Sequence, residues 1–244
     1  MDEAKILTDF YSLNVGDGTT MQAYVAHPDD DVTHPGLIVI QEAFGVNAYI
    51  RDVTERFARQ GYVAIAPELF HRTAAPGFEG SYDDFPAMMP HMQGVTNKGA
   101  EADLRAAHEW LKSKSYVDST RVASVGFCMG GRLSFLANSA LPLRAAISFY
   151  GGNIPLLLDR VAALSGPMLF FWGELDKHIA VDQRQKVLQA MKTSGKQYVN
   201  VEFSNADHGF FCDARGSYQP EASRMAWKLT LEFLEMHVGG VPAQ

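Results

Sequence analysis

One short segment, Gly-Phe-Cys-Met-Gly at residues 126–130, constrains the fold of this chain more than any other. It follows an apolar, strand-like run at residues 121–125 and precedes a helix-like stretch at residues 131–137. A strand that turns into a helix within so few residues strains the backbone of the central residue, and side chains two positions away on either side would collide. Glycine at both positions removes that collision. The turn therefore presents Cys128, whose chemistry would run through a thiolate.

Short apolar runs alternate with helical patterns along the rest of the chain. The predicted strands are residues 20–26, 36–40, 62–66, 121–125, 145–150, 167–172 and 198–203. The predicted helices are residues 49–60, 98–114, 131–137, 182–192 and 220–237. This alternation predicts a mainly parallel sheet with helices on both faces. Because the turn at Cys128 has the form of the nucleophile elbow of α/β-hydrolases, we expect one α/β-hydrolase domain over residues 1–244.

The segment at residues 71–97 interrupts the alternation and is rich in proline, glycine, methionine and aromatic residues. A loop of this length is uncommon in a compact domain unless it covers a site. Two interpretations are open, a surface insertion and a lid that covers a pocket. The apolar residues of the segment favour the lid: Phe78, Tyr82, Phe85, Met88, Met89 and Met92.

Charge and cysteine content exclude several classes of protein. The net charge of -7 argues against a general nucleic-acid binder, which needs a basic face. No apolar run is long enough to cross a bilayer, so we expect no membrane partner. The N-terminal residues lack the pattern of a signal peptide. With only Cys128 and Cys212 there is no disulfide framework, which predicts a reducing, cytoplasmic location.

A cysteine nucleophile needs a base and an acid that orients the base, and in this fold the acid precedes the base along the chain. Asp176 and His208 each follow a predicted buried strand, where the fold places those two groups. Asp176 could instead cap the next helix. Glu174 and His178 are the local alternatives for acid and base, and Asp182 is better explained as a helix cap.

A second group of residues follows the predicted strand at residues 36–40. The backbone N–H groups of Ala43 and of Met129, which follows Cys128, are the expected oxyanion-hole donors. Each such donor typically stabilises the transition state by about 3 kcal/mol. Glu42 then lies within plausible reach of Cys128, although a loop glutamate could also point into water.

The chain resembles the dienelactone hydrolase (carboxymethylenebutenolidase) family. The matching motifs are Gln-Glu-Ala-Phe-Gly at 41–45, Ala-Pro-Glu-Leu-Phe at 66–70, Gly-Phe-Cys-Met-Gly-Gly at 126–131, Trp-Gly-Glu-Leu-Asp at 172–176 and His-Gly-Phe at 208–210. The resemblance implies that Cys128, His208 and Asp176 form a catalytic triad. It also implies that Glu42 contacts Cys128 in the resting enzyme and keeps the thiol protonated until substrate binds. No metal or cofactor is required.

Family members that cleave dienelactone bind the substrate carboxylate with two arginines. Arg72 matches the first of these. The second is expected four residues after His208, where this chain has Cys212, while Arg215 is nearby but out of register. The substrate class implied is therefore a small ester or lactone, with Arg72 orienting an anionic group. Phe44 and the segment at residues 71–97 would shape the pocket, and Cys212 would pack in its wall.

Other functions are compatible with the same residues. A broader esterase or thioesterase would use the same machinery without preferring lactones. A redox sensor or binding protein would use only the thiol of Cys128 and would not need His208 and Asp176. A metal site at His208 and Cys212 would have too few ligands from one loop for a closed zinc site.

Overall fold

The computed structural model describes residues 5–239, in which eight strands form one sheet in the order β1-β2-β4-β3-β5-β6-β7-β8. Strands β1 and β2 pair antiparallel, β2 also pairs antiparallel with β4, and the remaining neighbours are parallel. The strands are β1 (Ile6–Asn14), β2 (Thr20–Pro28), β3 (His34–Ile40), β4 (Val63–Pro67), β5 (Val117–Phe127), β6 (Ala145–Phe149), β7 (Met168–Gly173) and β8 (Tyr198–Phe203). This arrangement confirms the mainly parallel sheet predicted from the sequence.

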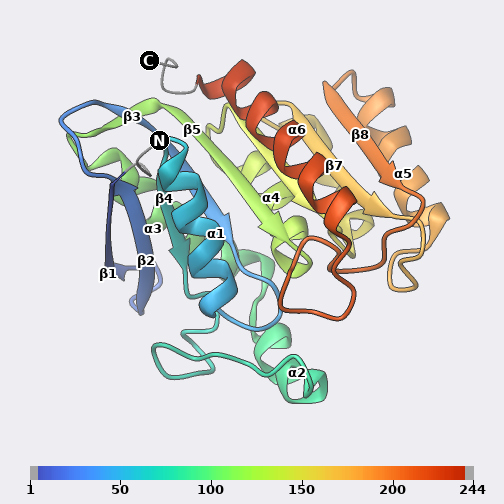
Figure 1. Ribbon diagram of the computed structural model, residues 1–244, viewed down its shortest axis with the longest axis horizontal. Helices are drawn as coiled ribbons and strands as arrows, with labels where there is room; N and C mark the ends of the chain where they lie inside the picture. The colour runs from blue at the N-terminus through green and yellow to red at the C-terminus, as the bar shows by residue number, and fades with distance from the viewer. Residues whose placement is uncertain (1–4, 240–244) are drawn as a thin grey trace.

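Helices cover both faces of the sheet (Figure 1). They are α1 (Ala48–Arg59), α2 (Phe85–Gly94), α3 (Asn97–Lys112), α4 (Met129–Ala140), the 3-10 helix η1 (Ile154–Ala163), α5 (Val181–Thr193) and α6 (Pro220–Val238). Helices α1 and α6 share one face, where the rings of Phe57 and Trp227 lie 4.7 Å apart. Helix α4 contacts α3 and η1, and η1 contacts α5. Within residues 5–239, no helix is both long and apolar enough to span a bilayer.

The buried strands explain why the sheet lies between two helical layers. Every residue of β3, β4, β6 and β7 is buried, and most of their side chains are aliphatic or aromatic. Strands buried on both faces need cover on both faces, which the crossover helices supply. The central strands also end nearly level with one another: Ile40 pairs with Gly126, Phe127 with Phe149, and Phe149 with Phe171. The loops that follow them therefore meet at one edge of the sheet.

Several elements differ from the sequence prediction. Strand β1, helix α2 and η1 were not expected. Helix α5 begins at Val181 with Ala180 at its N-cap, so the prediction that Asp182 caps this helix is wrong. Asp182 lies in the first turn instead, and its carboxylate accepts a hydrogen bond from Lys186 Nζ at 2.9 Å.

The segment at residues 71–97 lies beyond the carboxyl ends of the central strands and contains α2 (Figure 1). It contacts the loop after β3: the Gly80 N–H donates to the Phe44 carbonyl oxygen at 2.9 Å. The side chain of Met88 packs with Ala43 and Phe44 in a small apolar cluster of its own. The segment therefore packs on the residues that follow β3.

Candidate functional site

Cys128 lies at the turn between β5 and α4, with a φ of 55° that non-glycine residues seldom adopt. Its N–H donates to the Phe149 carbonyl oxygen at 3.0 Å, which anchors the turn to the neighbouring strand. A Cβ atom at Gly126 would overlap the Gly130 carbonyl oxygen, and one at Gly130 would overlap the Ile40 carbonyl oxygen. Both glycines are therefore required for the turn that holds the half-buried Cys128 at the start of a helix.

His208 and Asp176 meet at the same edge of the sheet. The Nδ1 atom of His208 lies 2.8 Å from Asp176 Oδ2, and both side chains are nearly buried. The other carboxylate oxygen of Asp176 accepts the N–H groups of His178 and Ile179 at 2.7 and 3.2 Å. Asp176 thus fixes its own loop with one oxygen and orients the imidazole with the other. Glu174 is exposed and forms no such pair in the described structure.

The pKa values of this pair follow from the charges around it. Burial lowers the pKa of His208, but the negative charge of Cys128 and hydrogen bonds to Asp176 and Cys128 outweigh burial and raise that pKa to about 10. Burial raises the pKa of Asp176, but the His208 interaction outweighs it and the pKa is lowered overall. Because Nδ1 faces Asp176, Nε2 is the ring nitrogen left for an interaction with Cys128.

Glu42 is fully buried beside these residues. Its Oε1 accepts a hydrogen bond from the Tyr150 hydroxyl at 3.1 Å and lies 3.6 Å from Arg215 Nη1. Its Oε2 has no hydrogen-bond partner within the described part of the chain. Burial raises the pKa of Glu42, while Arg215, His208 and Tyr150 oppose that increase. In this structure Glu42 pairs with Tyr150 and Arg215.

Tyr150 was not identified from the sequence, although it immediately follows β6. Its φ of 39° is unusual for a tyrosine, and its side chain is fully buried. The ring lies edge-on to His208, with centroids 5.1 Å apart. Tyr150 therefore contacts both the imidazole and the buried carboxylate of Glu42.

The loop at residues 41–45 is held by the side chain of its first residue. Gln41 Oε1 accepts the Leu69 N–H at 3.0 Å, and Gln41 Nε2 donates to the Glu42 carbonyl oxygen at 3.3 Å. This ties the loop after β3 to the chain after β4. Ala43 and Phe44 are consequently buried next to the elbow.

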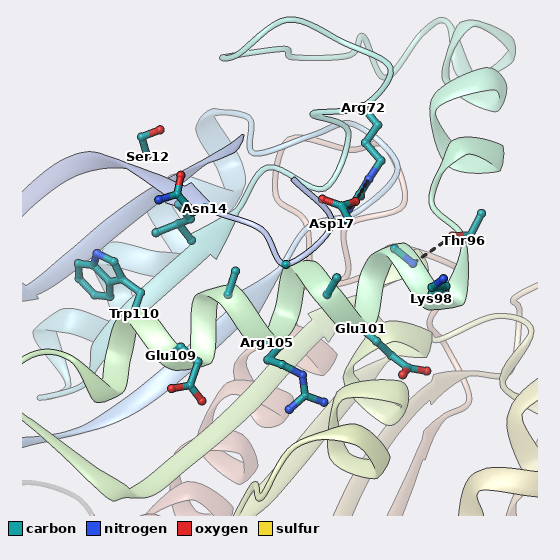
Figure 2. A pocket seen from close by; sticks show the side chains of 15 residues that line it. Ser12, Asn14, Asp17, Arg72, Thr96, Lys98, Glu101, Arg105, Glu109 and Trp110 are labelled. Carbon is teal, nitrogen blue, oxygen red and sulfur yellow. Dashed lines mark hydrogen bonds and ion pairs between the residues drawn. The ribbon is translucent and has the colours of Figure 1, made fainter. Parts of the chain in front are cut away.

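Arg72 is engaged elsewhere. Its guanidinium donates two hydrogen bonds to the fully buried Asp103, both at 2.8 Å, and two more to Asp17 at 2.6 and 3.0 Å. It borders a groove of about 990 Å³ along α3, whose lining does not include Cys128, Asp176 or His208 (Figure 2). Two carboxylates thus already occupy the guanidinium, and this arrangement does not support Arg72 as a substrate anchor.

Arg215 lies at the site instead. Its guanidinium carbon is 5.7 Å from the centre of the Phe44 ring and 6.0 Å from that of Tyr82. The chain reaches this position through consecutive turns, in which Cys212 N–H donates to the Gly209 carbonyl and Arg215 N–H to the Cys212 carbonyl. Those turns bring Arg215 back over the site although it is out of register in the sequence.

Cys212 is buried, and its Sγ donates to the Tyr82 hydroxyl oxygen at 3.4 Å. Burial, with a contribution from Glu42, raises the pKa of Cys212 to about 12, so it remains a thiol. Among residues 5–239, no three His, Cys, Asp or Glu side chains gather as a metal site would require.

Comparisons with known proteins find similar sequences and structures. A model of the "Dienelactone hydrolase family" matches residues 21–238. A Synechocystis protein named "Putative carboxymethylenebutenolidase" is 36% identical over 215 residues, which cover 84% of this chain and 87% of that protein. A Yersinia pestis protein of the same name is 32% identical over 92% of this chain and 87% of its own length.

A solved structure is similarly close. The crystal structure titled "Putative Dienelactone Hydrolase" from Klebsiella pneumoniae superposes with a TM-score of 0.86 at 33% identity, and the match covers 94% of this chain and 98% of that one. A second structure, titled as a dienelactone hydrolase-like promiscuous phosphotriesterase from metagenomic libraries, has a TM-score of 0.84 at 21% identity and supports the fold alone.

Proposed function

This chain belongs to the dienelactone hydrolase family, a family of hydrolases, and from that premise we propose that it cleaves a small ester or lactone with Cys128 as nucleophile. The observation that carries the proposal is the arrangement of Cys128, His208 and Asp176. They come from three separate loops, and the Nδ1–Oδ2 distance of 2.8 Å leaves the other ring nitrogen of His208 available to the thiol.

In the first half of the reaction, the Cys128 thiolate attacks the carbonyl carbon of the substrate, and the C=O electron pair moves onto oxygen. The backbone N–H groups of Ala43 and Met129 hold that oxyanion. Met129 is the first residue of α4, so its N–H has no acceptor within the helix. When the carbonyl re-forms, the C–O bond to the alcohol breaks and His208 gives that oxygen a proton. An acyl-enzyme remains.

In the second half, His208 removes a proton from a water molecule, which attacks the thioester carbonyl. The second tetrahedral intermediate expels the Cys128 thiolate and releases a carboxylic acid. With a lactone, the alcohol and the acid are parts of one hydroxy acid. Asp176 keeps the imidazole oriented through both halves and stabilises its positive charge.

Arg215 is the group best suited to bind an anionic part of the substrate. Glu42 is its only carboxylate within 4 Å among the described residues, and it lies at 3.6 Å. Phe44 forms the wall beneath the guanidinium. Tyr82 and Met88 of the segment at residues 71–97, which we propose to act as a lid, cover Phe44. The proposed substrate is therefore a small ester or lactone with a carboxylate.

The residues near Cys128 also suggest how the thiol is restrained before substrate binds. The Oε2 atom of Glu42 is buried without a hydrogen-bond partner among residues 5–239, and it could accept the thiol hydrogen after a rotation of the Cys128 side chain. A neighbouring carboxylate disfavours a thiolate, whereas His208 favours it. We propose that the two positions of the thiol correspond to a resting and a reactive enzyme. A reducing, cytoplasmic environment would keep this thiol available.

The test is hydrolysis of 4-nitrophenyl acetate by the wild type and by Cys128→Ala, His208→Ala and His178→Ala. We expect the first two variants to lose at least about 1000-fold in kcat/KM, since each removes a member of the proposed triad. His178 is exposed, with its ring 5.2 Å from that of His208, and its variant should stay within about threefold. Full activity in His208→Ala would contradict the mechanism and favour a protein that uses only its thiol.

A further inference from the structure

We infer that the hydroxyl of Tyr82 donates a hydrogen bond to an oxygen atom of the bound substrate, and that Asn47 and Cys212 hold it for that purpose. This inference rests on the proposed function and names one more group that binds the substrate. The observation behind it is that the hydroxyl oxygen of Tyr82, a residue beside Arg215, accepts two hydrogen bonds. The hydroxyl hydrogen can then be donated to a ligand.

Tyr82 is placed at the site by the segment at residues 71–97. Its ring lies 4.6 Å from that of Phe44, the residue that follows the proposed oxyanion donor Ala43. The guanidinium carbon of Arg215 is 6.0 Å from the centre of the Tyr82 ring. Tyr82 thus lies beside Arg215, the proposed anion-binding residue, and beside Phe44 of the loop at residues 41–45.

The first hydrogen bond to Tyr82 has a fixed direction. Asn47 Nδ2 donates to the Tyr82 hydroxyl oxygen at 2.9 Å. The other side-chain atom of Asn47, Oδ1, caps helix α1 by accepting the Ile50 N–H at 3.1 Å. Because an amide oxygen cannot donate, this cap determines which end of the Asn47 amide faces Tyr82. The tyrosine oxygen is therefore the acceptor.

The second hydrogen bond has the same direction. Cys212 Sγ lies 3.4 Å from the Tyr82 oxygen, and Cys212 is a thiol that carries a hydrogen. Its hydrogen is thus directed to Tyr82, whose oxygen is a better acceptor than sulfur.

A tyrosine hydroxyl has one hydrogen to donate, and here two neighbours already use its oxygen as an acceptor. Among residues 5–239, the Tyr82 hydroxyl accepts these two hydrogen bonds and donates none. A buried or half-buried hydroxyl without an acceptor is unfavourable, and a ligand oxygen would remove that cost. Because Arg215 supplies a positive charge beside it, the oxygen that fits is that of a carboxylate.

The test compares two chromogenic esters of similar size, 4-nitrophenyl hydrogen succinate, which carries a carboxylate, and neutral 4-nitrophenyl butyrate. For Tyr82→Phe we expect kcat/KM for the succinate ester to fall about tenfold relative to the butyrate ester, mainly through KM, since hydrogen bonds to charged groups are the stronger kind. Tyr116→Phe is the matched control, because Tyr116 is a half-buried tyrosine that precedes β5 at the other end of the strand. Equal losses on both esters would overturn the inference.

A binding measurement separates this inference from the proposed reaction. Methyl hydrogen succinate is titrated calorimetrically into Cys128→Ala and into Cys128→Ala with Tyr82→Phe, neither of which can form an acyl-enzyme. We expect about tenfold weaker binding when the hydroxyl is absent. If the wild type hydrolyses neither ester but this difference persists, the reaction is wrong and the role of Tyr82 holds. Identical affinities for the two variants would overturn the role of Tyr82 alone.

Cys212 provides a third comparison. Cys212→Ala removes the donor to Tyr82, so the preference for the succinate ester should fall by about threefold, whereas Cys212→Ser restores a donor and should retain the preference. A loss in Cys212→Ser equal to that in Cys212→Ala would show that Cys212 acts by packing rather than by positioning Tyr82.

Discussion

Two opposite electrostatic influences act on the sulfur of Cys128. His208, oriented by Asp176, stabilises a thiolate through its positive charge. Glu42 is a buried carboxylate in the same site, and a carboxylate disfavours a second negative charge nearby. Tyr150 and Arg215 hold Glu42 through a hydrogen bond of 3.1 Å and an ion pair of 3.6 Å. The reactivity of the thiol therefore depends on which neighbour it faces.

Removing the charge of Glu42 tests this balance. In Glu42→Gln we expect Cys128 to react with iodoacetamide about 3- to 10-fold faster at neutral pH, because the thiolate is no longer opposed by a carboxylate. The rate is measured by mass spectrometry of the alkylated protein. Glu174→Gln, an exposed carboxylate near Asp176, should leave the rate unchanged. An unaltered rate in Glu42→Gln would show that Glu42 does not restrain the thiol.

The same pair predicts how stability depends on pH. The pKa of His208 rises from 6.5 to about 10 in the folded protein. A group whose pKa is raised on folding stabilises the protein fully below its unfolded pKa and loses that contribution as the pH passes its folded pKa. We therefore expect the free energy of unfolding to decrease between pH 6.5 and about 10.

Urea unfolding of the wild type and of Cys128→Ala across this range measures the effect. The variant lacks the charge that raises the pKa of His208, so its decrease should be smaller and should occur at lower pH. Tyrosines and lysines titrate in both proteins and cancel in the comparison. If the free energy of unfolding had the same pH dependence in both proteins, Cys128 and His208 would not interact electrostatically.

Residues defined by a local pattern could be predicted from the sequence, and residues defined by a long-range contact could not. Cys128, Asp176 and His208 follow strands in the order the fold requires, and the structure pairs Asp176 with His208. Arg215 depends on the path of a loop with consecutive turns, which no periodicity encodes. Arg72 matched a family position but is bound by two carboxylates distant in sequence, Asp17 and Asp103.

At the scale of elements, helix α2 is held to the protein by little buried surface. Only Met88 of its ten residues is buried, while Phe85 and Met89 are exposed. Pro90 lies inside the helix and removes one of its backbone donors. Met88 is therefore the buried contact of this helix with Ala43 and Phe44, with Met92 and the ring of Phe85 packed beside it.

Two neighbouring methionines allow a matched test of that contact. Met88→Ala should destabilise the local structure by about 2 kcal/mol, at the low end for a buried methionine, because the site can partly collapse. Hydrogen exchange should then quicken across residues 78–94 while the sheet keeps its protection. Met89→Ala, at the exposed position on the same helix, should exchange as the wild type does. Equal effects in the two variants would show that Met88 does not anchor the segment.

Each element that the sequence did not predict lacks the regular pattern that marks a strand or a helix, for a reason of its own. Strand β1 lies at the edge of the sheet, so most of its residues are exposed and the alternation that marks a strand is weak. Helix α2 contains two prolines, and η1 begins with Asn153 in a left-handed conformation. By contrast, the fully buried strands β3, β4, β6 and β7 were predicted within one or two residues, because burial on both faces leaves a continuous apolar run.

At the scale of the molecule, one buried charge cluster joins elements that are far apart in the chain. Asp103 of α3 is fully buried and accepts hydrogen bonds from Arg72 and from His71 Nε2 at 3.0 Å. Arg72 also binds Asp17, in the turn between β1 and β2 (Figure 2). The cluster thereby connects the first hairpin, the base of the segment at residues 71–97 and the helix that precedes β5.

This cluster predicts that Arg72 stabilises the fold rather than binding substrate. Arg72→Met leaves Asp103 with a charge that only His71 can offset, and the free energy of unfolding should fall by about 3 kcal/mol. Arg59→Ala, which breaks the surface pair with Glu55, should cost at most about 0.5 kcal/mol.

The kinetic readout separates structure from recognition. In the folded Arg72→Met protein, the preference for 4-nitrophenyl hydrogen succinate over 4-nitrophenyl butyrate should remain within about threefold of the wild type, whereas Arg215→Met should lose about tenfold of it. Urea unfolding and the two-ester comparison are therefore made on the same preparations. If the Arg72 variant had normal stability but had lost the preference for the succinate ester, Arg72 would be the residue that binds the substrate carboxylate. The pairing with Asp103 and Asp17 would then have to break when substrate binds.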